Sequence, residues 1–229
     1  APELGVVGAA QSLVVLTAGI DLSVGAIMVL CSVIMGQFTF RYGLPPGLSI
    51  LCGLGAGAFF GYLNGVMVAR LRLPPFIVTL GMWQILLAAN FLYSRNETIR
   101  SQDIEAQAPI LQLFAAKFTF AGADFTLGTL FMIALMLFLA FVLRHTAWGR
   151  HVYAVGDDPQ AAELSGINVK ATLVSVYIIA GLICAMAGWV LIGRIGSVSP
   201  NSGQQANIES ITAVVIGGIS LFGGRGSIL

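Results

Sequence analysis

Charged residues are scarce in this sequence of 229 amino acids. Asp, Glu, Lys and Arg make up 9% of the chain, whereas hydrophobic residues make up 57%. A soluble domain usually carries about 25% charged residues. So few charges could not cover the outside of a soluble fold that buried this much apolar surface. The composition therefore predicts a membrane protein, with most of its surface in contact with the lipid bilayer.

The chain also has almost no net charge: the formal value at pH 7 is only +1. No basic field is available to attract phosphates, so a nucleic-acid partner is excluded. Cysteine is rare as well. Cys31, Cys52 and Cys184 each stand alone in an apolar run, without the spacing of a metal or redox site, and are expected to be small buried hydrophobic residues.

Catalytic motifs are missing too: there is no H-E-x-x-H, no nucleophile elbow and no zinc-binding spacing. The stretch Gly218–Ser227 (GISLFGGRGS) echoes a phosphate-binding loop, but it lacks the lysine and follows an apolar run that does not have the pattern of a strand. We therefore predict no metal, no cofactor and no enzymatic activity.

Long uncharged runs dominate what is present, and they mark the expected membrane spans. The runs are 4–20, 22–40, 42–69, 73–94, 125–143 and 171–193, followed by two shorter ones at 195–208 and 210–224. The four runs between 42 and 193 reach the roughly 20 residues that cross a bilayer as a helix. These runs predict an all-α fold, a polytopic transmembrane bundle.

The range 4–40 is too long for one passage, since a single helix there would extend about 55 Å. Its one charge, Asp21, stands between Gly19 and Ser23. Glycine is typical of a helix end, and Asp or Ser of a helix start. We expect two helical pieces that are broken around Asp21.

A short internal repeat accompanies this break. Gly19–Gly25 (GIDLSVG) resembles Gly218–Gly224 (GISLFGG), and each follows an apolar run. Transporters commonly carry duplicated halves with broken helices at matching positions. We predict a single transmembrane domain over 1–229 with a first half at 1–94 and an incomplete second half at 171–229. The glycines assigned to the breaks are Gly19, Gly25, Gly217, Gly218, Gly223 and Gly224. Because the chain opens on Ala1 and stops just after the glycine-rich motif, we expect a fragment of a longer protein.

Four polar connections separate the spans, at 41–46, 70–75, 95–124 and 144–170. Alternate connections face opposite sides, so 70–75 shares a side with 144–170, and 41–46 with 95–124. Positive charge should mark the cytoplasmic side. Each side carries five Lys or Arg residues, so charge alone leaves the orientation open.

Polar residues inside the apolar runs are the candidates for a solute path. An ionisable residue within a span is a functional candidate, and Asp21 could accept hydrogen bonds from solute hydroxyls or cap the second helical piece. Neutral polar residues either bond across helices or face a wet cavity, and helix contact is the alternative for Asn64 between Gly61 and Gly65. A largely neutral lining is typical of a path for an uncharged polar solute. The candidate pathway residues are Asp21, Ser23, Asn64, Thr79, Gln84 and Asn90.

A short helix is expected within the connection 144–170. Asp157 or Asp158 can cap it, Pro159 suits its first turn, residues 160–164 favour helix, and Gly166 ends it. A helix isolated between two spans offers a docking surface to a partner, and an ordered loop is the alternative.

Five collinear blocks resemble the ribose/xylose-type branch of ATP-binding-cassette (ABC) importer permeases. They are GIDLSVG at 19–25, NGV at 64–66, LPPFIVTLGM at 73–82, GRHVYAVGDDPQAAELSGINV at 149–169 and AVVIGGISLFGGRGSI at 213–228. The resemblance implies a membrane-spanning subunit that imports a monosaccharide across the bacterial inner membrane. It also implies three protein partners: a cytoplasmic ABC ATPase, a periplasmic sugar-binding protein and a second copy of the permease.

The helix at 157–166 is similar to the coupling helix of that family, which docks in a cleft of the ATPase. The resemblance assigns this role to Asp157, Asp158, Pro159, Ala161, Ala162, Ser165 and Gly166. It places 144–170 in the cytoplasm and 95–124 in the periplasm. The pair Asp157-Asp158 is more acidic than is common in the family, which bears on the choice of partner. Two alternatives stay open: another small solute (a cyclic polyol, a signalling furanone or a nucleoside), or an ion-coupled secondary transporter.

Overall fold

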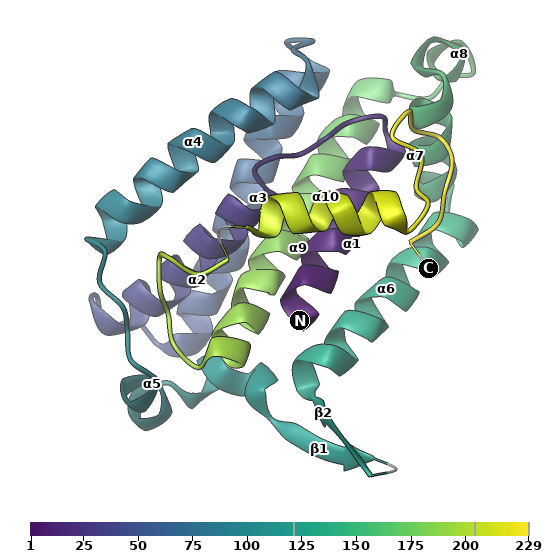
Figure 1. Ribbon diagram of the computed structural model, residues 1–229. Coiled ribbons are helices and arrows are strands. Elements are labelled where there is room, and N and C mark those ends of the chain that lie inside the picture. Colours follow the sequence, from purple (N-terminus) through teal and green to yellow (C-terminus); the bar gives the residue numbers. More distant parts are fainter. Residues whose placement is uncertain (121, 204, 229) are drawn as a thin grey trace.

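Four helices of the computed structural model are long and apolar enough to cross a membrane. They are α3 (Pro46–Ala69), α4 (Pro75–Ser94), α6 (Leu127–His145) and α9 (Val169–Ile195). The structure describes residues 1–120, 122–203 and 205–228 (Figure 1). The four helices coincide with the four predicted spans to within a few residues, and the helical-bundle fold class is confirmed.

Three shorter apolar helices complete the bundle: α1 (Pro2–Leu16), α2 (Val24–Phe40) and α10 (Ala206–Ile216). The predicted break around Asp21 is confirmed, because α1 ends before it and α2 begins after it. The residue that turns the chain is not Gly19, however. Ala18 adopts the left-handed conformation, with φ of 59°, and the N–H of Gly19 then bonds the carbonyl of Val14 at 3.2 Å.

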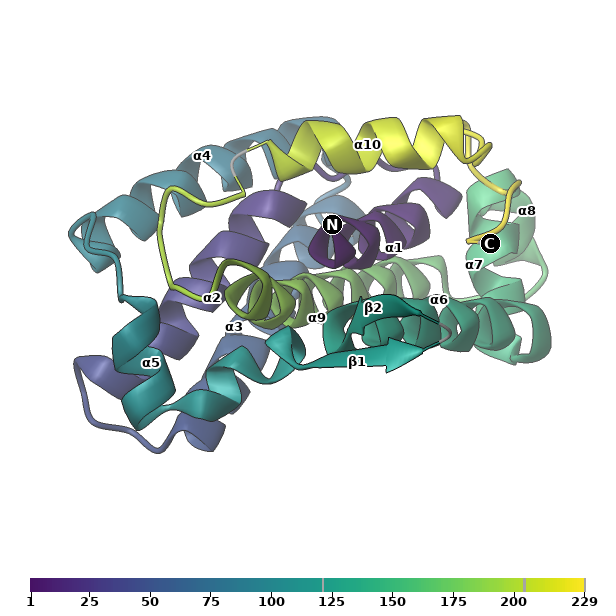
Figure 2. The same cartoon turned by 60° about the horizontal axis from the view of Figure 1, so that its bottom comes forward.

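The two short runs at 195–208 and 210–224 are not spans. Beyond Ile195, the end of α9, α10 is the only helix among their described residues, and it lies across the bundle with its start beside α2 and its end near α7 (Figures 1 and 2). Gly217 and Gly218 explain why the helix stops at Ile216, because Gly218 takes a positive φ value that other residues rarely adopt. Gly223 and Gly224 also have positive φ values, but they shape the loop that follows.

α9 lies at the centre of the bundle and packs most closely against α3. Glycines recur every four residues on α3, at positions 53, 57, 61 and 65. A Cβ at Gly61 would overlap the carbonyl oxygen of Tyr177, and one at Gly65 would come within 3.0 Å of the Cα of Val174. Small residues let the two backbones approach, which is how helices associate where lipid removes the hydrophobic driving force.

The segment from 95 to 126 is more ordered than the predicted loop. It forms α5 (Ser101–Gln107), the 3₁₀ helix η1 (Pro109–Ala115) and an antiparallel hairpin of β1 (Lys117–Phe120) and β2 (Ala123–Thr126). Alternation of polar and aromatic residues in Lys117-Phe118-Thr119-Phe120 is the strand pattern, and Phe118 stacks on its cross-strand partner Phe125. The hairpin is therefore a small exception to the all-α description.

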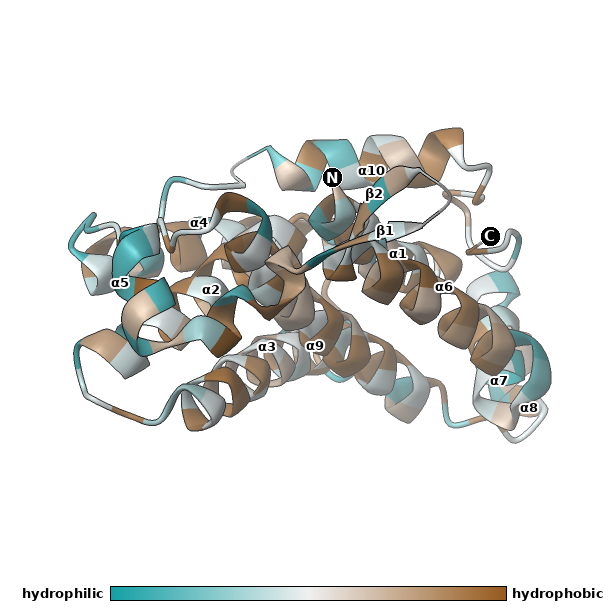
Figure 3. Ribbon diagram, turned by 90° about the horizontal axis from the view of Figure 1, so that it is seen from below, coloured by the Kyte–Doolittle hydropathy of each residue, from teal (hydrophilic) through white to brown (hydrophobic). Residues whose placement is uncertain are grey.

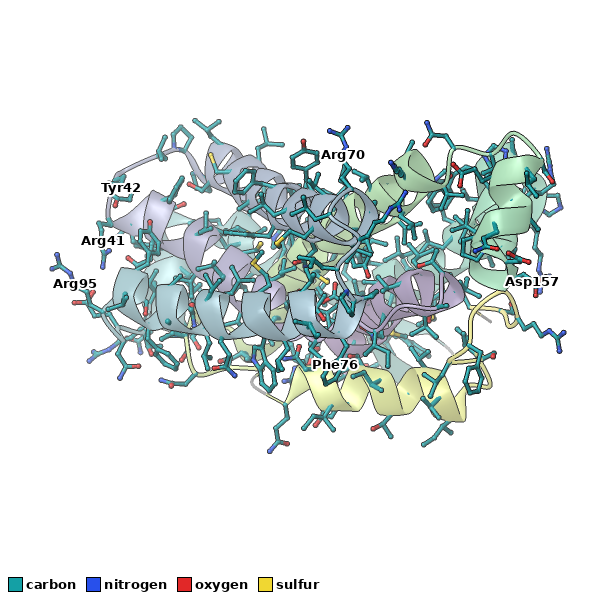
Figure 4. The ribbon with its side chains drawn as sticks, turned by 90° about the horizontal axis from the view of Figure 1, so that it is seen from above. Arg41, Tyr42, Arg70, Phe76, Arg95 and Asp157 are labelled. Carbon is teal, nitrogen blue, oxygen red and sulfur yellow. The ribbon has the colours of Figure 1, made fainter. Side chains whose placement is uncertain are left out.

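At the opposite end, two helices stand where one was predicted. α7 (Ala147–Asp157) precedes α8 (Pro159–Leu164). The Thr146 hydroxyl caps α7 by accepting the N–H of Gly149, and Val152 and Val155 are buried. Hydrophilic colour gathers on α5 and on α7–α8 in Figure 3. Figure 4 places Arg41 and Arg95 at one end of the structure and Asp157 at the other. The predicted sharing of one side by the connections 41–46 and 95–124 agrees with this placement of Arg41 and Arg95.

Candidate functional site

Asp21 forms hydrogen bonds with Ser23, the residue directly before α2. Its Oδ1 atom accepts hydrogen bonds from the backbone N–H of Ser23 at 2.7 Å and from the Ser23 hydroxyl at 2.6 Å. Ser23 itself occupies the N-cap position of α2, so Asp21 is not the cap that one interpretation of the sequence made it. The carboxylate instead fixes the turn that leads into the helix.

Other helices contribute polar groups to the same break. The Asn64 amide of α3 donates to the Ser23 hydroxyl at 2.9 Å, and the Thr79 hydroxyl of α4 lies 3.1 Å from the carbonyl of Ile20. With its amide oriented to suit its neighbours, Gln11 of α1 bonds both backbone groups of Asp21. Asp21, Ser23, Asn64 and Thr79 thus meet in one buried network. The hydrogen bond of Asn64 joins α3 to the start of α2, which supports the interpretation of Asn64 as a contact between helices.

The remaining two pathway candidates lie elsewhere on α4. Asn90 is 2% exposed and donates its amide N–H to the carbonyl of Pro200 at 2.9 Å. Gln84 is exposed on the outer face of the helix and does not join the network or Asn90. The face of α4 that carries Thr79 and Asn90 is the one packed inward. Gln84 points away from it because five residues separate it from Thr79, about 140° around a helix.

The end of α10 repeats the turn at the end of α1. Gly218 has φ of 85°, and the N–H of Ile219 bonds the carbonyl of Val214 at 3.3 Å, the arrangement that Ala18 and Gly19 make with Val14. Gly218 therefore corresponds to Ala18 in structure, whereas the sequence repeat pairs it with Gly19. The same turn also ends α8, where Gly166 has φ of 85° and the N–H of Ile167 bonds the carbonyl of Ala162, so it is a general helix end and the duplication stays a prediction.

Three distant segments meet beside the first break. The N–H of Gly224 donates to the carbonyl of Leu16 at 2.9 Å, which joins the loop after α10 to the end of α1. Gly156 of α7 faces both groups: a Cβ there would overlap the Leu16 carbonyl oxygen and lie 2.7 Å from the Gly224 nitrogen. We call this contact of Leu16, Gly156 and Gly224 the glycine junction. It joins α7 directly to the broken helix.

α8 is built as the sequence predicted for residues 158–166. Asp158 accepts the N–H groups of Gln160 and Ala161 at 2.9 and 3.0 Å, Pro159 is the first helical residue, and Gly166 ends the turn with φ of 85°. Asp157 differs from the expectation, because it is the last residue of α7.

The surface of α8 is mostly open. Ala161, Ser165 and Gly166 are exposed, but Ala162 is 4% exposed and packs inward, so it is closed to a docking partner. Sequence reasoning missed Leu164, whose side chain is 90% exposed. A lone leucine in a short polar helix was the available signal. Among the described residues, no group of three His, Cys, Asp or Glu side chains could hold a metal ion.

The chain as a whole was then compared with known proteins. Residues 2–227 match the family described as the permease component of the branched-chain amino acid transport system. The chain belongs to this permease family. No solved structure matches it significantly.

Similar permeases come from several bacteria. The chain is 71% identical to the fructose import permease protein FrcC of Rhizobium meliloti, over 99% of this chain and 63% of that protein. It is 34% identical to the ribose import permease protein RbsC of Bacillus subtilis, over 98% and 68% of the two chains. It is 32% identical to the galactose/methyl galactoside import permease protein MglC of Haemophilus influenzae, over 99% and 69%. The chain thus spans about two thirds of the length of these relatives.

The structure of the permease brings two of the five resemblance blocks together at the end of α1. Gly156 of the block at 149–169 and Gly224 of the block at 213–228 meet at the carbonyl of Leu16, three residues before the block at 19–25. The block at 73–82 supplies Thr79, and the block at 64–66 supplies Asn64, to the network around Ser23. The motifs that resemble the family are therefore the residues that build the break and its connection to α7.

Proposed function

We propose that this permease is the membrane subunit of an ATP-driven importer that carries a monosaccharide, with fructose as the first candidate, across the bacterial inner membrane. The observation that carries the proposal is the 71% identity to the fructose import permease, with ribose and galactose permeases at greater distance. The few charges inside the bundle agree with a neutral solute. The permease itself performs no chemistry, since ATP hydrolysis belongs to a partner.

α8 is the proposed docking point for the ATPase, which places 144–170 in the cytoplasm. Leu164 is the anchor: an apolar side chain that is 90% exposed suits a cleft in a partner protein. A groove with a volume of about 880 Å³ lies between α8 and the connection from α3 to α4. Its lining includes Arg72, Glu163 and Lys170. The opposite end, with α5 and the hairpin, then faces the periplasmic binding protein. A second copy of the permease completes the assembly.

The glycine junction offers a route from the ATPase to the solute path. Motion of α8 is passed to α7, because one residue separates the two helices. At Gly156, α7 touches the backbone of Leu16 and Gly224 with no side chain between them. A shift of α7 therefore moves the break that the Asp21 network holds. ATP binding would bias the permease between outward-open and inward-open states through this contact.

The test is uptake into vesicles that hold the full-length permease with its ATPase and binding protein. Radiolabelled fructose, ribose, galactose, a cyclic polyol and a nucleoside form the panel. ATP-dependent accumulation of one sugar is the expected result. Accumulation of the polyol or the nucleoside instead would keep the class and change the solute. Uptake without ATP, driven by a sodium or proton gradient, would overturn the proposal in favour of a secondary transporter.

The coupling role has its own variant. Leu164→Asp should abolish ATP-driven uptake and co-purification of the ATPase while the permease still inserts in the membrane. Leu113→Asp is the control for co-purification of the ATPase, which it should keep, because Leu113 is also an exposed leucine but lies in η1 at the other end of the structure. Normal uptake by Leu164→Asp would remove α8 from the coupling path.

A further inference from the structure

A cavity of about 300 Å³ lies beside the starts of two helices. The first turn of α2, the second half of α4 and the start of α10 enclose it, and its lining includes Gly25, Trp83, Asn90, Phe91 and Asn207. Small-molecule sites in proteins usually measure about 300–1,000 Å³. The cavity is thus large enough for one small solute, and it lies inside the bundle next to the first break.

Asn90, one of the residues that line this cavity, carries an unpaired acceptor. Its amide N–H group is used by the carbonyl of Pro200, but its Oδ1 atom is buried and has no hydrogen-bond partner among the described residues. Burying an acceptor without a donor is unfavourable, and most buried acceptors in proteins are satisfied. A solute hydroxyl that donates to Oδ1 would remove this deficit.

Asn207 ties together the two helix starts at the cavity. Its Oδ1 atom accepts the N–H of Gly25 at 2.6 Å, across 182 residues of sequence, so the first turns of α2 and α10 face each other. Its Nδ2 group has no acceptor in the part of the chain that the structure describes. The first turn of a helix also presents N–H groups that the helix itself cannot satisfy. Asn207 and these helix starts therefore supply donors for solute oxygens.

The rest of the lining is aromatic and apolar. Trp83 and Phe91 form part of the wall, and no charged side chain lines the cavity among the described residues. An amino acid would lose the hydration of its ammonium group without gaining a carboxylate partner. A monosaccharide has hydroxyls that pair with amides and a C–H face that packs on an aromatic ring. The chemistry of the lining favours the sugar.

We propose that this cavity is the solute-binding site within the membrane, where Asn90 accepts a sugar hydroxyl, Asn207 donates to a sugar oxygen and Trp83 packs on the ring. The site rests on the proposed function and adds to it a place in the permease where sugars are distinguished. Asn90 and Trp83 are specificity-determining residues in this scheme. The permease as well as the binding protein would then discriminate between sugars.

The experiment uses the full-length permease with its ATPase and a single unchanged binding protein, reconstituted in vesicles. Initial uptake rates are measured for the transported sugar and for analogues that each lack one hydroxyl. The variants are Asn90→Leu and Trp83→Leu. Gln84→Leu is the matched control, because it replaces an amide by leucine on the exposed face of the same helix. Stimulation of ATP hydrolysis by the loaded binding protein is recorded alongside.

Asn90→Leu should raise the KM for the sugar at least tenfold and erase the discrimination against one of the deoxy analogues. Asn90→Leu should keep the stimulated ATP hydrolysis, and Gln84→Leu should keep both uptake and discrimination. If Asn90→Leu fails to assemble, Trp83→Leu decides, because the indole makes no hydrogen bond within the described part of the chain whose loss would unfold the helix. Unchanged KM and discrimination in the variant that assembles would overturn the site. Absence of ATP-driven sugar uptake by the unmodified permease would instead overturn the proposed function.

Discussion

Gly57 of α3 lies directly against Gly181 of α9, backbone on backbone. A Cβ added to either glycine would overlap the carbonyl oxygen of the other. This is one of the close backbone contacts between the two helices that form the centre of the bundle. Two residues away on α3, Gly55 is exposed, and a Cβ there would meet nothing within 4 Å. The same substitution at these two glycines should therefore have opposite effects.

We expect Gly57→Ala to lower the free energy of unfolding by about 1–3 kcal/mol, because the methyl group forces the helices apart. Gly55→Ala should leave it unchanged or raise it by up to about 1 kcal/mol, through the better helix propensity of alanine. Thermal unfolding of the two full-length variants in detergent makes the comparison. Equal unfolding temperatures would show that α3 and α9 do not pack through this contact.

The two helix-ending turns make a second matched pair. Ala18 and Gly218 occupy the same left-handed position, with φ of 59° and 85°, but only one of them is glycine. The left-handed conformation costs an ordinary residue about 1–2 kcal/mol. Ala18→Gly should therefore stabilise the protein by up to about 1 kcal/mol, and Gly218→Ala should destabilise it by about the same amount. Chemical denaturation of both variants tests the signs, and a destabilising Ala18→Gly would contradict the shared geometry.

The hydrogen bond from Asn64 to Ser23 should be measurable as a coupling between α3 and the break. The two groups lie 2.9 Å apart and both side chains are fully buried. Hydrogen bonds between membrane helices average about 0.6 kcal/mol by double-mutant cycles, with a maximum near 1.7. We expect a coupling in this range from Asn64→Ala, Ser23→Ala and the double variant. The exposed pair Thr98 and Ser199, 3.4 Å apart, should give a coupling near zero.

Composition and run length were sufficient to predict the spans and the break. A segment that crosses lipid has few alternatives to a helix, because each of its backbone groups must form a hydrogen bond within the segment. α8 was also predictable, since capping and proline chemistry are local: Asp158 and Pro159 act within one turn. The hairpin and α7 were missed. They lie in the polar connections between the predicted spans. An irregular loop is also stable there, so the amino-acid composition does not exclude it.

The contacts that make the candidate site are long-range, and the sequence does not contain them as a local pattern. Nothing in the local sequence marks Asn207, although its bond to Gly25 joins the starts of α2 and α10. Gln84 and Asn90 have similar side chains on one helix, and only the packing of α4 separates the exposed residue from the buried one. Leu164 was passed over because an exposed leucine is known only when the fold shows what leaves it uncovered.

The ion pair of Glu3 and Arg194 provides the last prediction, because only one partner is buried. Arg194 Nε lies 2.6 Å from Glu3 Oε1, and the exposed fractions of the two side chains are 48% and 2%. Breaking a fully buried pair by removing one partner costs about 3–5 kcal/mol. The exposure of Arg194 reduces the expected loss for Arg194→Met to about 1–3 kcal/mol.

The buried carboxylate is the cause of that loss, so neutralising it should restore stability. Glu3→Gln added to Arg194→Met should recover a large part of the unfolding free energy, which a simple loss of the arginine stem would not allow. The pair of Arg41 and Glu97 is the control: Glu97 is 64% exposed and lies 3.7 Å from the arginine. Glu97→Gln should cost less than about 1 kcal/mol. A double variant that is no more stable than Arg194→Met would show that the charge of Glu3 is satisfied by other means.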